Sequence, residues 1–236
     1  MPPKVLLGCP TAEYKQYCLK EYLNAITSLT YDNYSILIVD NSPSHHYKKI
    51  IEKQLNKRNK KNIPATVLKD EFLERAKDRI VQSRNIIRER VVKENYDYLF
   101  NLEQDVIPPP DVIERLLAHK RHVVSGLYFT EYEVNNRKEV HPLAWQKDAA
   151  GVLRFIDPRS LIRNQVVKVH ASGLGCVMLK RSIVQQVPFR LFEDRSTYDD
   201  MPFYYDLFMK KIPVYLDTSV KCKHLIHGMH WEVLKE

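Results

Sequence analysis

The first half of this sequence alternates short apolar runs with longer amphipathic ones, and that alternation limits the folds it can adopt. Runs with the length and composition of buried β-strands occur at Lys4–Cys9, Tyr34–Val39, Ala65–Lys69 and Tyr98–Leu102. Helices are predicted between and after them, over Thr11–Leu29, Tyr47–Arg58, Glu71–Lys93 and Asp111–Lys120. Such alternation predicts an α/β fold with a mostly parallel central sheet and helices on both faces.

The predicted helix Thr11–Leu29 carries an apolar stripe. Thr11 is a plausible N-cap, and the expected inner face comprises Tyr14, Cys18, Tyr22, Ile26 and Leu29. This stripe would pack the helix against the sheet.

The second half of the chain has shorter β-like pieces. They lie at Val123–Phe129, Val140–Arg154, Val166–His170, Cys176–Leu179 and Val214–His224, with one helix predicted over Thr197–Lys211. We see no repeat and no low-complexity linker, so we expect a single domain over residues 1–236, with a smaller mixed β part in its C-terminal half.

A formal net charge of +8 predicts affinity for anions, which include nucleotide diphosphates, nucleic acids and anionic membranes. Much of the excess lies in Lys53–Lys61, which we interpret as a solvated helix face and loop. That segment lacks the interleaved aromatic residues of a single-strand binder, and no helix-turn-helix or RNP-like signature occurs. Nucleic acid is therefore a disfavoured partner.

The four cysteines form no C-x-x-C pair, and we expect buried thiols in a reducing compartment. No apolar run approaches the roughly 18 residues of a membrane span, and no secretory signal is visible. We expect a cytoplasmic protein. Peripheral contact with the anionic inner membrane surface through Lys53–Lys61 is compatible with that expectation.

Two carboxylates follow the predicted strand Tyr98–Leu102. Glu103 and Asp105, separated by Gln104, would lie at the sheet edge where parallel sheets bind ligands. Neighbouring carboxylates repel each other unless a cation lies beside them, so a divalent metal is their natural partner. Such a metal can also hold the phosphates of a nucleotide diphosphate. Ordinary acidity of a turn is the alternative.

Two further polar sites are predicted near this edge. Asp40 and Asn41 follow the second strand, and Arg84 lies beside the inner-face positions Ile80 and Ile87 of a helix. Arginine there could bind a phosphate or a base through two hydrogen bonds, or form a structural ion pair.

The C-terminal part adds an acidic pair and several histidines. Asp199 and Asp200 precede an amphipathic helix, where one could be a general base or a simple N-cap. His224 and His227 follow the last strand, and imidazole beside carboxylate suits Mn²⁺. A zinc cluster with Cys222 and His230 is a further alternative, although the spacing matches no common structural zinc site.

Taken in order, these motifs resemble the GT-A glycosyltransferases, in particular the large inverting group called family two. The resemblance covers nearly the whole chain and rests on the order and spacing of several short motifs. They are Cys9-Pro10-Thr11, Val39-Asp40-Asn41-Ser42, Ser83-Arg84-Asn85, Glu103-Gln104-Asp105, Gly173-x-Gly175, Asp199-Asp200 and His224. The resemblance implies a GT-A-type, Rossmann-like fold that transfers a sugar from a nucleoside-diphosphate sugar to an acceptor hydroxyl.

The resemblance also implies roles in a nucleotide-sugar-binding half, residues 1–122. Residues expected to contact the donor nucleotide are Pro10, Thr11, Asp40, Asn41, Arg84, Glu103 and Gln104. Glu103 and Asp105 stand where the family has D-x-D, and Asp105 matches its metal-binding position, for Mn²⁺ or Mg²⁺. His224 matches a histidine that completes the metal site in some members.

The acceptor-binding and catalytic half is expected over residues 123–236. Asp200 matches the family's catalytic base and Asp199 the acid before it, while Gly173, Gly175 and Trp145 are assigned to the acceptor side. A single base and no second nucleophile would give inversion of configuration. The acceptor could be a saccharide, a lipid-linked molecule or a protein.

Three residues depart from the family pattern. Glu103 stands where Asp is commoner, Asp199 stands where Glu is usual, and Asn41 stands where a second Asp is frequent. Among rival enzymes, a nucleotidyltransferase would carry a glycine- and arginine-rich loop after the first strand, where this chain has Gly8–Glu13. A Rossmann dehydrogenase would need G-x-G-x-x-G. A non-catalytic basic protein that binds nucleic acid or membrane is the alternative from another class.

Overall fold

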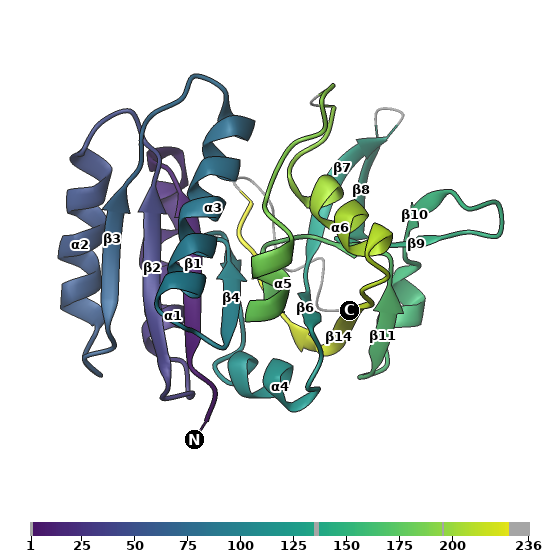
Figure 1. The fold of residues 1–236 in the computed structure, drawn as a ribbon, viewed down its shortest axis with the longest axis horizontal. Coiled ribbons are helices and arrows are strands. Elements are labelled where there is room, and N and C mark those ends of the chain that lie inside the picture. The colour runs from purple at the N-terminus through teal and green to yellow at the C-terminus, as the bar shows by residue number, and fades with distance from the viewer. Residues whose placement is uncertain (1, 135–136, 195, 227–236) are drawn as a thin grey trace.

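The computed structural model describes residues 2–134, 137–194 and 196–226, and its centre is an eight-stranded sheet (Figure 1). The strands lie in the order β11-β14-β6-β13-β4-β1-β2-β3. Their bounds in chain order are β1 Val5–Thr11, β2 Tyr34–Asp40, β3 Ala65–Lys69, β4 Tyr98–Leu102, β6 Val123–Leu127, β11 Val166–Val169, β13 Cys176–Lys180 and β14 Val214–Lys221. Only β13 and β11 run against the other strands. The mostly parallel sheet predicted from the sequence is confirmed.

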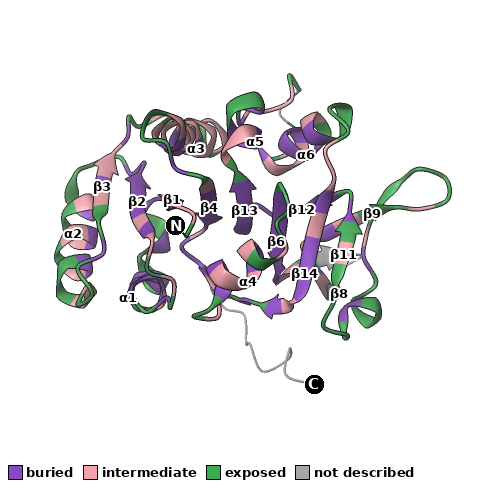
Figure 2. Cartoon of the chain, turned by 60° about the horizontal axis from the view of Figure 1, so that its bottom comes forward, coloured by how far each residue is buried: buried purple, intermediate pink, exposed green. Residues whose placement is uncertain are grey.

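Helices cover both faces of this sheet, and Figure 2 shows the buried strands between the two helical layers. One core lies under α1, α2 and α4, and the other under α3, α5 and α6. The bounds are α1 Leu19–Thr27, α2 His46–Arg58, α3 Ala76–Lys93, α4 Val112–Ala118, α5 Arg181–Gln186 and α6 Asp200–Met209. The predicted α/β class is therefore confirmed.

Strand β1 is buried at every position, because helices pack on both of its faces. Val5, Leu7 and Cys9 belong to one core and Leu6 to the other, as the two-residue side-chain repeat of a strand requires. Gly8 lets α3 approach closely, since a Cβ there would lie 2.3 Å from Ile87 Cγ2.

The C-terminal half adds the smaller β part that the sequence predicts. Three short antiparallel groups are present among the described residues: β10-β9-β12, β7-β8 and β15-β5. Their bounds are β5 Val106–Ile107, β7 Phe129–Val134, β8 Arg137–Pro142, β9 Ala144–Lys147, β10 Leu153–Phe155, β12 Ala171–Ser172 and β15 Lys223–His224. A short 3₁₀ helix, η2, spans Pro158–Leu161.

Strand register brings polar strand ends to one edge of the sheet. Thr11 at the end of β1 pairs with Asp40 at the end of β2, and Glu103 follows β4, the other neighbour of β1. Because β13 is antiparallel to β4, its first residue, Cys176, pairs with Leu102 at this same edge. We call it the carboxyl edge.

The predicted helix Thr11–Leu29 is wrong in its first turns. Thr11 belongs to β1, and residues Glu13–Cys18 form a 3₁₀ helix, η1, before α1 begins. A 3₁₀ helix aligns residues three apart, so Lys15 rather than Tyr14 shares the inward side with Cys18. Accordingly, Tyr14 is 68% exposed and Lys15 only 9%.

Two structural findings bear on membrane contact. The lysines at 53, 57, 60 and 61 are exposed on α2 and the turn after it, as expected for a solvated face. None of the helices in the described ranges combines the length and apolarity needed to cross a bilayer.

Candidate active site

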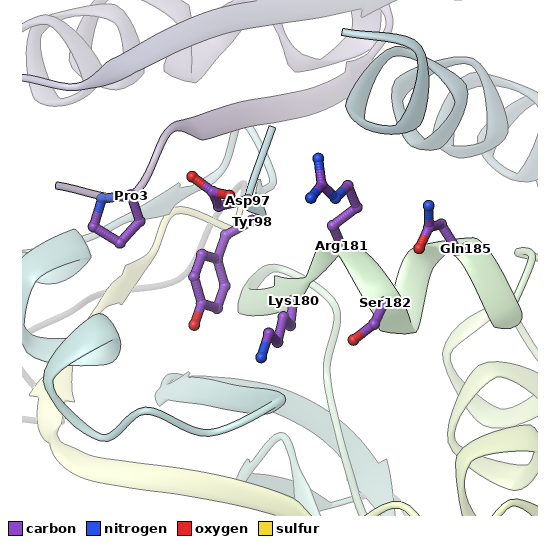
Figure 3. A pocket seen from close by; sticks show the side chains of 7 residues that line it. All are labelled: Pro3, Asp97, Tyr98, Lys180, Arg181, Ser182 and Gln185. Carbon is purple, nitrogen blue, oxygen red and sulfur yellow. The ribbon is translucent and has the colours of Figure 1, made fainter. Parts of the chain in front are cut away.

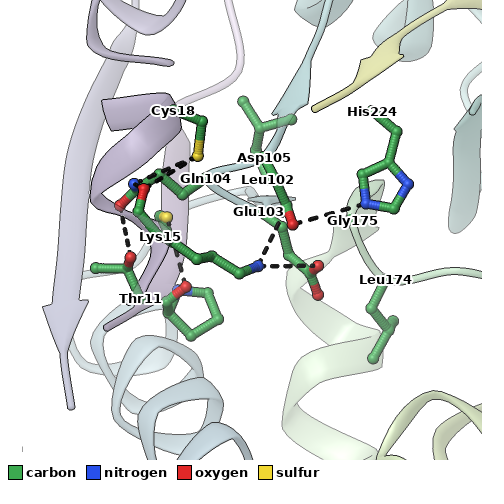
Figure 4. Close-up of polar contacts among 12 residues, drawn as sticks. Thr11, Lys15, Cys18, Leu102, Glu103, Gln104, Asp105, Leu174, Gly175 and His224 are labelled. Atoms are coloured by element: carbon green, nitrogen blue, oxygen red, sulfur yellow. Dashed lines mark hydrogen bonds and ion pairs between the residues drawn. The ribbon is translucent and has the colours of Figure 1, made fainter. Parts of the chain in front are cut away.

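Glu103 and Asp105 lie side by side at the carboxyl edge, with the ammonium group of Lys15 between them (Figure 4). Lys15 Nζ is 3.0 Å from Asp105 Oδ1 and 3.8 Å from Glu103 Oε2. Burial raises the pKa of Asp105, but Lys15 and His224 outweigh it and hold that pKa well below its usual range. Burial lowers the pKa of Lys15, but the two carboxylates raise it above its ordinary value. Asp105 and Lys15 are therefore both charged at neutral pH.

His224 approaches Asp105 because β15 pairs with β5, directly after Asp105. Its Nδ1 lies 2.8 Å from the carbonyl oxygen of Phe129. A carbonyl can only accept, so Nδ1 carries a proton, and in the neutral imidazole Nε2 keeps the lone pair that can bind a metal. Nε2 lies 3.7 Å from Asp105 Oδ2. That separation is too long for a hydrogen bond, and a carboxylate oxygen and an imidazole nitrogen are both ligand types that a divalent ion such as Mn²⁺ accepts.

Asp105 and His224 therefore fit a divalent metal, with the Phe129 carbonyl orienting the imidazole. In the described part of the chain, no group of three or more His, Cys, Asp or Glu side chains could hold a metal. Two protein ligands leave positions for phosphate oxygens and water. His227, the other candidate ligand, lies outside the described residues, as does His230 of the zinc alternative.

Arg84 connects the carboxylate after β4 to the start of α6. It is 1% exposed, forms an ion pair with Glu103, and its Nε lies 2.7 Å from Asp199 Oδ2. Burial lowers the pKa of Arg84, but Asp199 and Glu103 raise it above its usual value. The arginine thus has the structural ion pairs considered from the sequence, and these pairs bring the Asp199-Asp200 dipeptide to the carboxyl edge.

Asp200 is the first residue of α6 and is partly buried. Burial raises its pKa to about 6; a hydrogen bond from the Met201 amide, 2.8 Å away, opposes that shift, and the neighbouring Asp199 adds to it. A carboxylate with a pKa near neutrality can accept a proton from a reacting hydroxyl efficiently.

Asp40 provides a buried acceptor at the end of β2. Its Oδ1 accepts from the amide of Ser42 at 2.9 Å and from the Ser42 hydroxyl, whereas Oδ2 is buried with no hydrogen-bond partner among the described residues. An unpaired buried carboxylate oxygen is costly, so it fits an N–H or O–H donor from a ligand.

The side chains beside Asp40 are already paired within the protein. Asn41 donates to Ser83 Oγ at 3.1 Å, and Ser83 donates to Asp70 at 2.8 Å. Asp70 was not singled out from the sequence. Asp70 comes directly after the short β3, and β1 and β2 also end in polar residues at this edge. A polar residue at the end of a third strand could therefore have pointed to Asp70 in the sequence.

Gln104 and Thr11 hold η1 in place. Gln104 Oε1 accepts from the Thr11 hydroxyl, while its Nε2 donates to the carbonyl of Lys15 (Figure 4). The same Oε1 also accepts from the Tyr47 hydroxyl. Gln104 is fully buried, and Pro10 is buried within β1. The side chains of Gln104 and Thr11 therefore bind to the protein itself, and they position Lys15.

Gly173 and Gly175 lie around the side chain of Tyr128, which the sequence did not reveal as part of the site. A Cβ on Gly173 would lie 2.0 Å from Tyr128 Oη, and one on Gly175 would lie 2.7 Å from it. The Gly175 amide donates to this oxygen at 2.8 Å, and the Gly175 carbonyl accepts from the Glu103 amide at 3.0 Å. Both glycines are buried; they leave room for the Tyr128 ring, and Gly175 also binds the backbone of Glu103.

Trp145 belongs to a partly exposed aromatic cluster on β7–β10. Its ring packs against Phe155 with centroids 5.2 Å apart, and Tyr132 and His141 also pack on Phe155, at 5.2 and 4.6 Å. Burial raises the pKa of Tyr132, and the charge of Asp200 adds to that rise.

A surface hollow of about 450 Å³ lies at the other end of the sheet (Figure 3). It is lined by residues that include Asp97, Tyr98 and Lys180, at the amino end of β4 and the paired end of β13. None of the candidate site residues lines it. The charged groups that converge at the carboxyl edge therefore lie away from this hollow.

Comparisons with known proteins show the fold. No family model and no curated protein matches this sequence. GalNAc-T7, solved with UDP, GalNAc and Mn²⁺, matches with a TM-score of 0.68 and 13% identity over 95% of this chain and 44% of its own. The mannosyltransferase PcManGT from Pyrobaculum calidifontis, in complex with GDP-Man and Mn²⁺, matches with a TM-score of 0.61 and 12% identity over 99% and 60%.

TarS from S. aureus, in complex with UDP, matches with a TM-score of 0.57 and 14% identity over 93% of this chain and 60% of its own. This chain thus spans between 44% and 60% of the length of these three structures. At such identities the likeness concerns architecture, and the chain has the GT-A fold of glycosyltransferases, as its motifs predicted.

Proposed function

We propose that this GT-A protein is a glycosyltransferase that moves a sugar from a nucleoside-diphosphate sugar to an acceptor hydroxyl. The observation that supports this best is the chain of ion pairs from Glu103 through Arg84 to Asp199. It joins the candidate metal carboxylates after β4 to the candidate base at the start of α6. Residues 1–122 would form the donor half and residues 123–236 the acceptor and catalytic half.

The donor nucleotide is proposed to bind across the ends of β1 and β2. The unpaired Oδ2 of Asp40 would accept a hydrogen bond from the base or ribose, beside Pro10, Thr11 and Asn41. Asp105 and His224 would hold Mn²⁺ or Mg²⁺, which when bound neutralises charge on the diphosphate. Arg84, kept cationic by Glu103 and Asp199, adds positive potential at the same edge.

Asp200 is the proposed general base. Its carboxylate takes the proton of the acceptor hydroxyl, whose oxygen attacks the anomeric carbon of the donor sugar. The bond from that carbon to the diphosphate breaks on the opposite side, and the electron pair leaves with the diphosphate. A single displacement of this kind inverts the configuration. The raised pKa of Asp200, about 6, makes it basic enough for this step near neutral pH.

The acceptor is proposed to bind on the side of the aromatic cluster that contains Trp145. Gly173 and Gly175 contribute by fixing Tyr128 behind the site. Aromatic faces suit the apolar face of a saccharide ring, and a lipid-linked or protein acceptor could present such a ring.

We propose a cytoplasmic location, supported by four free and buried cysteines. The exposed lysines of α2 would allow peripheral contact with an anionic membrane.

The test is a thermal-shift panel of nucleoside diphosphates and nucleotide sugars, with and without Mn²⁺. A ligand that binds only the folded state raises the melting temperature, and we expect the largest rise when both are present. A protein that responds to oligonucleotides in a strongly salt-dependent way, and to no nucleotide sugar, would instead be a basic binding protein.

A further inference from the structure

Lys15 lies where its charge opposes a metal ion. Its ammonium group contacts Asp105 Oδ1 at 3.0 Å, while Asp105 Oδ2 faces His224 Nε2 at 3.7 Å (Figure 4). One carboxylate therefore faces both a built-in cation and the imidazole that would share a metal with it. Glu103, the neighbouring carboxylate, lies 3.8 Å from the same ammonium group.

The protein holds Lys15 at this position from several sides. The side chain is 9% exposed, and its backbone carbonyl accepts from the buried Gln104, which also accepts from Thr11 and Tyr47. The conformational entropy of this long side chain is lost when the protein folds. Forming the ion pair therefore needs no further ordering, and every folded molecule contains it. Burial further limits screening of its charge by water and salt.

The five ion-paired groups of the site are nearly balanced without a metal. Three carboxylates, of Glu103, Asp105 and Asp199, face two cations, Lys15 and Arg84. A divalent ion beside Asp105 would turn the net charge of this ion-paired group positive and would lie close to the Lys15 ammonium. A diphosphate group, with two or more negative charges, would reverse that excess.

We propose that Lys15 competes with the divalent cation for Asp105, so that the cation binds tightly only together with the diphosphate of the donor. Lys15 is then a residue that couples the two ligands. The inference rests on the proposed donor and metal site. It adds that the site binds the divalent ion only weakly until the nucleotide is present. By thermodynamic linkage, the metal and the nucleotide must raise each other's affinity by the same factor.

The direct test needs no nucleotide and no activity. Mn²⁺ is titrated into the full chain, and free Mn²⁺ is followed by electron paramagnetic resonance. Lys15→Met and Lys15→Gln should bind Mn²⁺ at least about tenfold more tightly than the wild type, in the range of typical couplings. Lys15→Arg keeps the charge and should resemble the wild type. Lys20→Met, at an exposed position on α1, is the matched control and should change nothing.

Equal Mn²⁺ affinity in the wild type, Lys15→Met and Lys15→Gln would overturn the proposal. So would tight Mn²⁺ binding that survives Asp105→Asn, since the ion would then bind elsewhere. Two Lys15 variants are used because one could fail to fold, and each is checked by its melting curve.

A second titration separates this inference from the proposed function. Mn²⁺ binding is repeated with UDP or GDP present. In the wild type, nucleotide should increase Mn²⁺ affinity by about tenfold or more, and Lys15→Met should reduce that factor. If no variant binds either nucleotide, the donor site is refuted, while the nucleotide-free titration still decides whether Lys15 competes with the metal.

Discussion

Arg84 Nε lies 2.7 Å from Asp199 Oδ2, in an ion pair that connects the middle of α3 to the residue before α6. The same guanidinium group binds Glu103 after β4. Three elements that are far apart in sequence thus meet at one buried charge. Because both carboxylates depend on it, this arginine contributes to stability as well as to the site.

Arg84→Met should lower the free energy of unfolding by roughly 3–5 kcal/mol, because it leaves the buried carboxylate of Asp199 without its partner. Denaturant unfolding measures this. Arg90→Met on the same helix is the control: Arg90 forms an exposed pair with Glu94, four residues later, and its loss should cost at most about 0.5 kcal/mol. Similar losses for both variants would contradict the structural role of Arg84.

Asp200→Asn should lower kcat by roughly 10²- to 10⁴-fold while nucleotide binding is retained, because the variant cannot accept the proton of the acceptor. Sugar transfer and nucleotide thermal shifts are measured in parallel. Asp206→Asn, on the same helix, removes a surface pair with Arg190 and should keep its activity. Near-normal turnover of Asp200→Asn would exclude it as the base.

Activity should fall as the pH drops through about 6, the raised pKa of Asp200, because only the ionised carboxylate is a base. The rate profile of kcat/KM against pH measures this. The profile should cover pH 5 to 7, a range centred on the pKa of Asp200. A kcat/KM that stays constant over this range would contradict the assignment of Asp200 as the base.

The same shift predicts the sign of a stability effect. The pKa of Asp200 in the folded state lies above the unfolded value of about 3.9. Protonated Asp200 therefore contributes to the free energy of unfolding fully below about pH 4, and this contribution is lost as the pH rises through about 6. Asp200→Asn should therefore stabilise the fold at neutral pH, by about 3 kcal/mol. Melting temperatures of both proteins at acid and neutral pH check this, and a destabilised variant at pH 7 would contradict it.

Gly173→Ala should destabilise the protein by roughly 1–3 kcal/mol, because the new Cβ would overlap Tyr128 Oη. Adding Tyr128→Phe should recover part of the loss, since the hydroxyl is the nearest obstacle. Chemical unfolding of the two single variants and the double variant measures the coupling. Additive losses would show that the two side chains do not interact.

Trp145→Ala should raise KM for the acceptor and leave nucleotide binding unchanged, because Trp145 lies on β9 of a small separate sheet, whereas Asp40 ends β2 of the central sheet. Initial rates with varied acceptor, together with nucleotide thermal shifts, measure this. A loss of nucleotide binding would place Trp145 on the donor side instead.

Local patterns were sufficient to predict the first strands of the central sheet. The apolar runs at Lys4–Cys9 and Tyr34–Val39 correspond to β1 and β2, because strands buried on both faces carry continuous apolar sequence. The predicted helix at Glu71 begins instead at Ala76, after Asp70 has bound the Glu71 amide. Helix α5 was missed because six residues carry little periodicity.

The site was predictable as a set of residue types but not as a set of contacts. The acidic residues near positions 40, 103 and 200 follow or precede regular elements, which sequence can show. The burial of Lys15 depends on a 3₁₀ turn that shifts the helical phase, and the fit of Tyr128 against Gly173 depends on strand pairing between distant segments. No local pattern records either.

The antiparallel direction of β13 has a consequence for the segment between β6 and β13. Strand β6 ends at the carboxyl edge and β13 starts there, so the intervening segment leaves and re-enters the sheet at the same border. Apart from β11 at the margin of the sheet, that excursion holds no strand of the central framework. Under the proposed function, a change in the length of this segment would alter the acceptor side while the pairing of β4, β13 and β6 stays the same.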